Sequence, residues 1–467
     1  MIDKFLVIEE KYNFWDRNIE GFHYWAYIRR TIYESLYLKR SSAHDLKKLS
    51  LNDKLLILKD AVINLLNIKF LNENKDIVVR NHPRKIKAFD TSDEVCIYTE
   101  LLIQSLSKDN LIIMEKSYQG KHVPRIDECD VMYMDFIDII TYITSPILKL
   151  MHNRSLLNLE IEMIDVINIL ENELNLKINP KKILLDVKNL YIHYKIKYFL
   201  LNKILNKINP RLIIEVVHYN FENMIINEIA KKKNIRTIEL QHGILGKKHI
   251  NYNYSKKRIH SFFPDEIFLF SEYWKYNTRL PIDDSRQHIV GFPYIEKYVK
   301  NNNLYKKREC ILFISQATIG YELSKLAVQL GEELRERNLN YKIIYKLHPA
   351  EYLCWKVNYP WLYENSDFIE VIDYNINIYN LFEKSFIQIG VYSTALYEGL
   401  AFDLETYILN MSEADFVSDL YTSGYAVLIN NISDIIYLLK QLNVNKTSKK
   451  NHFWSQDALE KMIQLCK

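Results

Sequence analysis

Three short polar turns, each directly after an apolar run, hold the side chains of this chain that are best suited to chemistry. They are Gln241-His242-Gly243, Lys346-Leu347-His348-Pro349 and the stretch from Gly390 to Thr394. An imidazole has a pKa near working pH, so His242 would be able to take a proton from an attacking hydroxyl. The alternative interpretation of His242 is a buried histidine that hydrogen-bonds a carbonyl.

The third turn belongs to residues 386–400, FIQIGVYSTALYEGL, which predict a buried strand, a tight exit at Gly390 and a helix that begins at Ser393 and Thr394. A helix start has unpaired N–H groups and a partial positive charge, and two hydroxyls add donors, so this turn suits a phosphate. An ordinary helix cap is the competing interpretation. Glu398 lies one helical turn later and would either accept hydrogen bonds from ribose hydroxyls or face solvent.

The other two polar turns offer groups that would complement the same kind of ligand. Lys346 and His348 would supply positive or hydrogen-bonding groups to a diphosphate or monophosphate leaving group, unless His348 merely ends its strand. His82 and Arg84 follow the predicted strand at residues 76–80. Ligands of open α/β sheets bind at strand ends, so we take these two residues as candidates for the acceptor side of a cleft.

The elements that must position these turns alternate between strand and helix from residue 211 onward, which predicts parallel sheets with right-handed crossovers. We expect an α/β fold with two Rossmann-like domains facing a central cleft and additional N-terminal helices. The expected boundaries are 1–295 for an acceptor-side domain with helical insertions, 296–308 for a linker and 309–445 for a nucleotide-sugar-binding domain. Residues 452–467 should form a helix that packs back on the first domain.

Length and composition limit the classes of function. The chain has 467 residues, 48% hydrophobic and 26% charged, which suits a globular protein with two domains. A net charge of +4 is too small to indicate a nucleic-acid partner. The five cysteines form no CxxC pair, so neither a disulfide framework nor a zinc site is expected. No P-loop, Gly-rich dinucleotide loop, HExxH or DxD-like site is evident, which favours metal-independent chemistry and no cofactor beyond a nucleotide-sugar co-substrate.

The expected location is the cytoplasm. Acidic residues interrupt the N-terminal stretch where a signal peptide needs an apolar run, and the apolar segment 131–151 carries Asp135, Asp138 and Pro146. A membrane span is therefore not expected. The basic, aromatic segment 22–38 reads as a packed helix, with a peripheral contact at the cytoplasmic face of the inner membrane as its alternative.

The three motifs together resemble a known family. LQHG, KLHP and YSTALYEGLAF, in this order, resemble the bacterial capsule and surface-polysaccharide glycosyltransferases of GT-B fold, over residues 210 to 410. This group includes polysialyltransferase-like, Kdo-transferase-like and CDP-glycerol glycerophosphotransferase-like enzymes. The resemblance implies that His242 is a catalytic base and that His348, Ser393 and Thr394 bind the nucleotide phosphate.

The function expected from these motifs is transfer of a sugar from a CMP- or other NDP-sugar donor to a hydroxyl of a glycan or lipid-linked glycan of the bacterial surface, in capsule, lipopolysaccharide or lipooligosaccharide. Lys346, His348, Ser393 and Thr394 would hold the departing phosphate, while His242 deprotonates or orients the acceptor. The alternatives are a CDP-polyol phosphotransferase of teichoic-acid-like polymer synthesis, a sugar-nucleotide epimerase, and a non-catalytic carbohydrate-binding protein.

Overall fold

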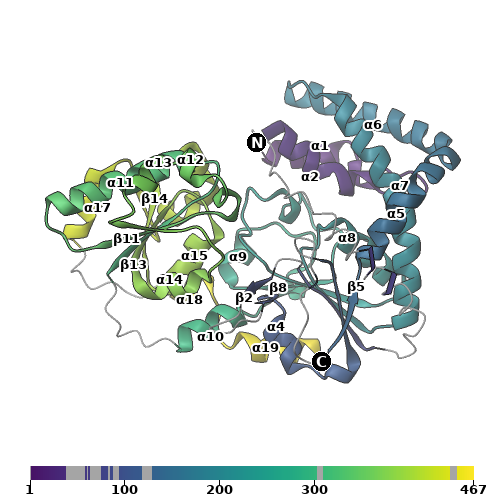
Figure 1. The fold of residues 1–467 in the computed structure, drawn as a ribbon. Coiled ribbons are helices and arrows are strands. Elements are labelled where there is room, and N and C mark those ends of the chain that lie inside the picture. Colours follow the sequence, from purple (N-terminus) through teal and green to yellow (C-terminus); the bar gives the residue numbers. More distant parts are fainter. Residues whose placement is uncertain are drawn as a thin grey trace. The chain divides into compact units, whose positions relative to one another are not determined.

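The computed structural model describes residues 2–37, 58–59, 62–63, 75–82, 85–87, 94–117, 122, 129–301, 309–441 and 450–467. Contacts between residues divide the chain into two units (Figure 1). Unit 1 comprises Met1–Lys85, Glu94–Val290 and Leu459–Lys467, and unit 2 comprises Ile86–Asp93 and Gly291–Ala458. Each unit is built on one parallel sheet, so the expected pair of Rossmann-like domains is confirmed.

Unit 1 has a seven-stranded sheet in the order β5-β4-β1-β6-β7-β8-β9, with all neighbouring strands parallel. Its central strands are runs of β-branched and aliphatic residues that are buried along their whole length, as expected when helices cover both faces of a sheet. The strands are β1 (Ile77–Arg80), β4 (Leu111–Glu115), β5 (Asp130–Tyr133), β6 (Leu212–Val216), β7 (Arg236–Leu240), β8 (Glu266–Leu269) and β9 (Gln287–Ile289).

The helices of unit 1 include three long ones that pack on one another, α5, α6 and α7, and two N-terminal ones, of which α2 packs on α7 and α1 on α6. The stripe of Trp25, Ile28 and Ile32 on α2 is fully buried, so this face of the helix is core. The helices are α1 (Ile2–Lys11), α2 (Tyr24–Tyr37), α4 (Glu100–Ser105), α5 (Asp135–Met151), α6 (Asn153–Leu174), α7 (Pro180–Ile208), α8 (Phe221–Lys232), α9 (Glu272–Tyr276) and α19 (Ala458–Cys466).

The C-terminal helix α19 completes the core of unit 1. Met462 and Cys466 are buried against strand residues such as Ile214 and Ile238. Arg236 donates to the carbonyl of Leu465 at 2.8 Å, which fastens the end of the helix to strand β7. The last residues of the chain therefore belong to the same compact unit as its first strands.

Unit 2 has a six-stranded parallel sheet in the order β12-β11-β10-β13-β14-β15. Helices flank both faces of this sheet (Figure 1). The strands are β10 (Cys310–Ile314), β11 (Lys342–Lys346), β12 (Ile369–Ile372), β13 (Ser385–Gly390), β14 (Glu405–Leu409) and β15 (Val427–Ile429). The helices are α10 (Pro293–Asn301), α11 (Gly320–Glu336), α12 (Trp355–Asn358), α13 (Pro360–Glu364), α14 (Ile378–Lys384), α15 (Thr394–Leu400), α16 (Ser418–Thr422), α17 (Ile432–Lys440) and α18 (Lys450–Phe453).

Helix α10 occupies part of the stretch that we expected to be the interdomain connection. Its Glu296 accepts hydrogen bonds from the backbone N–H groups of Asp457 and Ala458, at 2.9 and 2.8 Å. At Gly291, φ is +102° and an added Cβ would lie 2.2 Å from the carbonyl oxygen of Ser455. A side chain at this position would therefore collide with the backbone of the returning chain.

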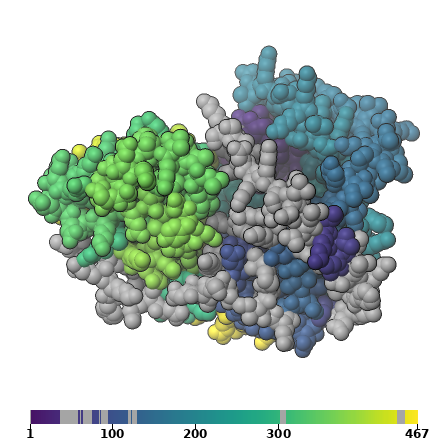
Figure 2. Space-filling view, in the orientation of Figure 1, coloured from purple at the N-terminus to yellow at the C-terminus, as the bar shows by residue number. Residues whose placement is uncertain are grey.

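Helices α5 and α6, which belong to the blue-to-teal part of Figure 2, carry exposed apolar side chains. Tyr142, Leu150 and Met151 are 84%, 81% and 74% exposed. Within the described ranges, no helix is both long and apolar enough to cross a bilayer. The peripheral membrane contact stays a prediction.

Candidate functional site

Strand order alone identifies one edge position in unit 1. From β1 the sheet grows through β4 to β5 on one side and through β6 to β9 on the other, so the order reverses between β1 and β6. Ligands of open α/β sheets bind outside the carboxyl ends of the strands at such a switch point. The turns that follow β1, β6 and β7 carry His82, Tyr219 and His242.

His242 lies beside two tyrosine hydroxyls at this edge. Its Nε2 is 3.2 Å from the hydroxyl of Tyr219, and its Nδ1 is 3.5 Å from the hydroxyl of Tyr252. The turn is held by Gln241, whose side chain donates to the carbonyl of Gly243 at 2.8 Å and accepts from the N–H of Phe270 at 2.8 Å. The side chain of His242 is 16% exposed, so it is enclosed but reachable.

A buried carboxylate, Glu239, organises the groups around His242. Its Oε2 lies 2.7 Å from His218 Nδ1, and its Oε1 accepts from the hydroxyl of Tyr252 at 2.6 Å and from the N–H of His218 at 3.0 Å. Its Oε1 is 3.9 Å from His242 Nδ1. Burial acts to raise the pKa of Glu239, but the charge and hydrogen bond of His218 outweigh it, and the pKa is lowered. An ionised carboxylate therefore lies beneath the histidine.

The environment of His242 keeps its imidazole neutral. Burial lowers the pKa of His242 to about 4, against the opposing attraction of Glu239. At neutral pH both the lone pair and the N–H of the ring are present, so the side chain can accept a proton from a hydroxyl or orient it. Any positive charge that forms on the ring would be stabilised by Glu239.

His82 is the acceptor-side candidate that the structure places next to His242. The two rings are nearly parallel, with centroids 6.5 Å apart, and Tyr98 lies 6.3 Å from each. The preceding residue, Asn81, is held by Thr99 at 2.6 Å and donates to Glu115 at 3.0 Å, which fixes the turn after β1. Arg84, the second acceptor-side candidate, lies outside the described residues.

The turn after β6 is strained. Val217 has φ +67°, a conformation that β-branched residues rarely adopt because Cβ crowds the backbone. The side chain of Asn223 donates to the carbonyls of Val216 and Val217, at 3.0 and 3.1 Å, and it accepts from Arg80 Nε at 3.1 Å. These bonds hold the strained turn and so fix the direction of Tyr219. Local strain of this kind concentrates at functional sites.

Unit 2 has a switch point of the same type, between β10 and β13. The turn after β10 and the turn after β13 are joined there by a hydrogen bond of 2.6 Å between the hydroxyls of Thr318 and Tyr392. At Gly390, the last residue of β13, an added Cβ would lie 3.3 Å from the carbonyl oxygen of Ile314. The two turns therefore approach each other closely at the edge of the sheet.

Lys346 and His348 lie at the end of β11, on the other side of β10. The ammonium of Lys346 donates to the carbonyl of Leu347 at 2.8 Å and to the hydroxyl of Tyr352 at 2.5 Å, and the side chain is buried. The Nδ1 of His348 accepts from the N–H of Ala350 at 3.2 Å as a helix cap. The strand-end interpretation therefore has direct support, and phosphate binding by these two residues stays a prediction.

A second buried glutamate, Glu351, ties the turns of unit 2 together. Its carboxylate accepts from the N–H of His348 at 2.6 Å, from Ser315 Oγ at 3.0 Å and from the hydroxyl of Tyr359 at 2.9 Å. Burial raises its pKa against these hydrogen bonds. Glu351 was not predicted from the sequence, although the spacing H-P-A-E is that of a capping box and predicts this contact.

Ser393 and Thr394 begin helix α15, as expected. Ser393 is the N-cap, and its Oγ accepts from the N–H of Ala395 at 3.2 Å. All three polar candidates of this helix, Ser393, Thr394 and Glu398, are partly exposed. The cap is thus real, and its role toward a phosphate stays a prediction. Among the described residues, no group of three or more acidic, histidine or cysteine side chains is arranged to hold a metal ion.

Tyr219 and Glu239 of unit 1 were also not predicted from the sequence. Glu239 had one detectable signal, since a glutamate inside the apolar strand RTIEL must be buried and needs a partner. Tyr219 had none, because its contact with His242 depends on which strands are neighbours.

The chain was compared with protein families, with curated protein sequences and with solved structures. No protein-family model and no curated protein sequence matches the chain. Among solved structures, the UDP-GlcNAc 2-epimerase from Methanocaldococcus jannaschii is 15% identical with a TM-score of 0.50, and the match covers 84% of this chain and 99% of that one. The UDP-GlcNAc 2-epimerase from Neisseria meningitidis bound to UDP-GlcNAc is 12% identical with a TM-score of 0.49, covering 84% and 98%. The wall teichoic acid polymerase TagF is 12% identical with a TM-score of 0.44, covering 91% and 97%. At these identities the likeness concerns the fold, which is a GT-B-like pair of Rossmann-like domains.

Proposed function

We propose that the protein is a glycosyltransferase that moves a sugar from a nucleotide-activated donor to a hydroxyl of a bacterial surface glycan, at the cytoplasmic face of the membrane. The observation that carries the proposal is the environment of His242. A neutral, partly exposed imidazole lies at the switch point of unit 1, hydrogen-bonded to Tyr219 and 3.9 Å from the ionised Glu239. This arrangement suits general-base catalysis of attack by a hydroxyl.

Unit 2 is proposed to bind the donor. The hydroxyls of Thr318 and Tyr392, with the cap residues Ser393 and Thr394, lie in turns at its switch point and offer neutral donors to a phosphate. His348 is proposed to contribute through the part of its ring that does not cap the short helix Pro349–Glu351, and Glu398 by accepting from ribose. The acceptor is proposed to bind on unit 1, near His82.

A panel of CMP-, CDP-, UDP- and GDP-sugars, UDP-GlcNAc included, tests the proposal through thermal stabilisation. A ligand at one hundred times its dissociation constant should stabilise the protein by about 2.7 kcal/mol. Transfer to a glycan acceptor by the stabilising donor, with EDTA present and absent, would then be measured by product mass. We expect transfer that EDTA does not abolish. No stabilisation by any nucleotide would contradict the proposal.

Two alternative reactions can be distinguished from glycosyl transfer by their products. A CDP-polyol phosphotransferase would release CMP and extend the acceptor by a polyol phosphate. An epimerase would change the stereochemistry of the sugar nucleotide with no acceptor present. The 2-epimerase of M. jannaschii shares the fold, which is the reason to include this second assay.

A further inference from the structure

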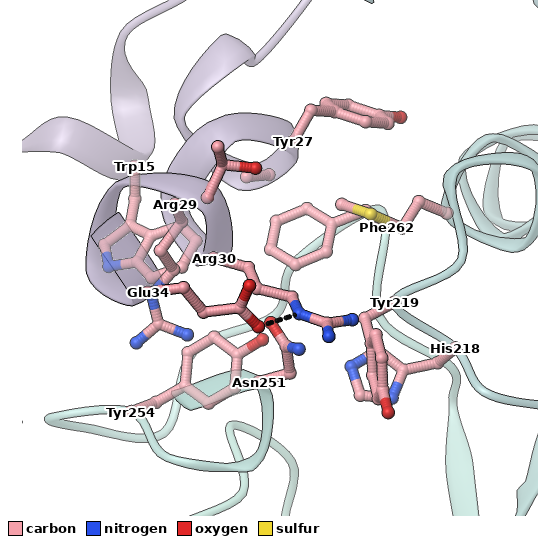
Figure 3. Close-up of a pocket in the computed structure, with 13 residues that line it drawn as sticks. Trp15, Tyr27, Arg29, Arg30, Glu34, His218, Tyr219, Asn251, Tyr254 and Phe262 are labelled. Carbon is pink, nitrogen blue, oxygen red and sulfur yellow. Dashed lines mark hydrogen bonds and ion pairs between the residues drawn. The ribbon is translucent and has the colours of Figure 1, made fainter. Parts of the chain in front are cut away.

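Unit 1 contains a pocket of about 330 Å³ beside the candidate site, under the N-terminal helix α2. Its walls come from α2, from the turn after β6 and from the segment around the short helix Ile250–Tyr252 (Figure 3). Tyr219 belongs both to this pocket and to the site, because its hydroxyl lies 3.2 Å from His242 Nε2. One side chain, Tyr219, therefore contacts both the pocket and His242.

The pocket is rigidly built. On α2, the guanidinium of Arg29 is buried and paired with Glu9, at 2.5 and 2.9 Å. It also donates to the carbonyls of Ile250 and Asn253, each at 2.7 Å. Arg29 thus ties helix α2 to the segment that forms the opposite wall. The walls are held in place before any ligand arrives, which lowers the entropic cost of binding.

One polar group in the pocket has no partner. The amide nitrogen of Asn251 is buried without a hydrogen bond to any described residue, and the residue as a whole is only 7% exposed. Figure 3 shows Asn251 directed toward the same point as Arg30 and Glu34. Leaving a buried donor unpaired costs free energy, so a ligand that accepts from this nitrogen would recover that cost.

The charges that line the pocket are already paired. Arg30 donates to Glu34 at 2.6 Å, and Arg29 is paired with Glu9. The guanidinium of Arg30 also lies over the ring of Tyr219, 5.2 Å from its centre. A ligand with a net charge would have no unpaired opposite charge to meet here. Hydrogen-bond donors in a pocket whose charges are paired instead suit an uncharged molecule rich in hydroxyls.

We propose that this pocket binds one uncharged sugar unit of the acceptor, with a ring hydroxyl accepting from Asn251. The pocket would thereby select a neutral hexose or N-acetylhexosamine and hold it against Tyr219, which contacts His242. The inference rests on the proposed function only for naming the sugar as the acceptor. Binding itself can be tested without any transfer reaction.

The test is saturation-transfer NMR of the full chain with methyl glucoside, methyl galactoside and methyl N-acetylglucosaminide, and with methyl glucuronide and glycerol 1-phosphate as charged probes. We expect at least one neutral glycoside to bind and both charged probes to bind more weakly. Asn251→Leu should weaken that binding about tenfold, because it removes the donor while keeping the branched shape of the side chain. The matched control is Asn158→Leu, the same change at an exposed position on α6.

Asn251→Leu should fold as well as the natural chain, because it removes an amide nitrogen that has no hydrogen-bond partner among the described residues. A second variant, Arg30→Gln, changes a half-exposed side chain and should also weaken binding, with Arg154→Gln as its control. In a transfer assay, Asn251→Leu should raise KM for the acceptor with little change in kcat.

Three results would overturn the inference: no neutral glycoside binds, a charged probe binds better than every neutral one, or binding is unchanged in both Asn251→Leu and Arg30→Gln. Failure of the proposed function has a different signature. If no donor supports transfer while a glycoside still binds in a manner that depends on Asn251, the pocket stands as a sugar site and the transferase proposal falls.

Discussion

The sheets of the two units have the same order of strands around a switch point, but the side chains at the two switch points differ in kind. In unit 1 the switch point between β1 and β6 is surrounded by the rings of His82, Tyr219 and His242. In unit 2 the switch point between β10 and β13 is lined by turns whose hydroxyls bond each other, Thr318 with Tyr392. The first set can move a proton, and the second can donate hydrogen bonds to an anion without changing protonation.

The buried glutamates of the two edges differ in the same way. Glu239 has His218 as its partner, which can carry positive charge, and the pKa of Glu239 is lowered despite burial. Glu351 receives hydroxyls and a backbone N–H, and burial raises its pKa. The buried glutamate that is held ionised therefore belongs to unit 1, whereas Glu351 of unit 2 positions turns through its hydrogen bonds.

The most severe test of this division is His242→Ala. Removing the base should lower transfer by about 10²–10⁴-fold, while nucleotide affinity in unit 2 changes little. Turnover rate and nucleotide binding would both be measured. His288→Ala, a histidine bonded to Glu266 at 2.8 Å in the same unit, is the control and should retain activity. Full turnover in His242→Ala would remove the residue from the mechanism.

Replacing each of the two glutamates by alanine compares their contributions to the free energy of unfolding. Glu239→Ala leaves His218 and Tyr252 without a buried charged partner and should lower the free energy of unfolding by about 3–5 kcal/mol. Glu351→Ala removes hydrogen bonds from neutral donors and should cost about 1–3 kcal/mol. Urea denaturation measures both. An equal or larger loss for Glu351→Ala would break the comparison.

Acid should destabilise unit 1 through its buried histidines. Burial lowers the pKa of His242 to about 4 and the pKa of His260 to about 3, from 6.5. The unfolded chain binds these protons first as pH falls, so the stabilising contribution is complete above pH 6.5 and is lost progressively toward pH 3. For His242 the loss amounts to about 3 kcal/mol.

Calorimetry between pH 7 and pH 4 would measure this loss, and His260→Phe should make the pH dependence shallower. His260 packs against the rings of Trp15 and Phe262, with ring centres 4.5 and 4.9 Å away, so phenylalanine suits the site. An unchanged pH dependence in this variant would show that His260 does not contribute.

The smallest effect is expected at the start of α15. Ser393→Ala with Thr394→Ala should lower stability by about 1 kcal/mol through loss of the cap and should also weaken nucleotide binding. Asn431→Ala removes the cap of α17 in the same unit and is the matched control. Equal nucleotide affinity in both variants would show that Ser393 and Thr394 act only as a helix cap.

Much of the fold could be predicted from local pattern. The strands of unit 2 and strands β6 to β8 appear where apolar runs end in polar turns, because burial on both faces of a parallel sheet requires such runs. Helix α10 was not predicted, since residues 296–308 were expected to form a linker and this range covers most of the helix. Its role depends on Glu296 receiving residues 457 and 458, which are distant in sequence.

Single residues of the candidate site could be predicted from the sequence, but their contacts with one another could not. His242 and His348 stood out because each follows a strand, yet one faces a tyrosine at its Nε2 and the other caps a short helix through its Nδ1. The pocket residue Asn251 belongs to no motif. Its buried amide nitrogen could be found only in the tertiary structure, where Arg29 joins helix α2 to the segment that contains Asn251.

The sequence by itself determined that polar side chains would leave the carboxyl ends of parallel strands, because hydrophobic periodicity and turn residues act over a few neighbouring positions. Tertiary structure decided which of those side chains would meet. Strand order sets His82, Tyr219 and His242 side by side and buries Glu239 beneath them. Protonation and hydrogen bonding depend on burial and on charges brought from elsewhere in the chain, and local pattern contains neither.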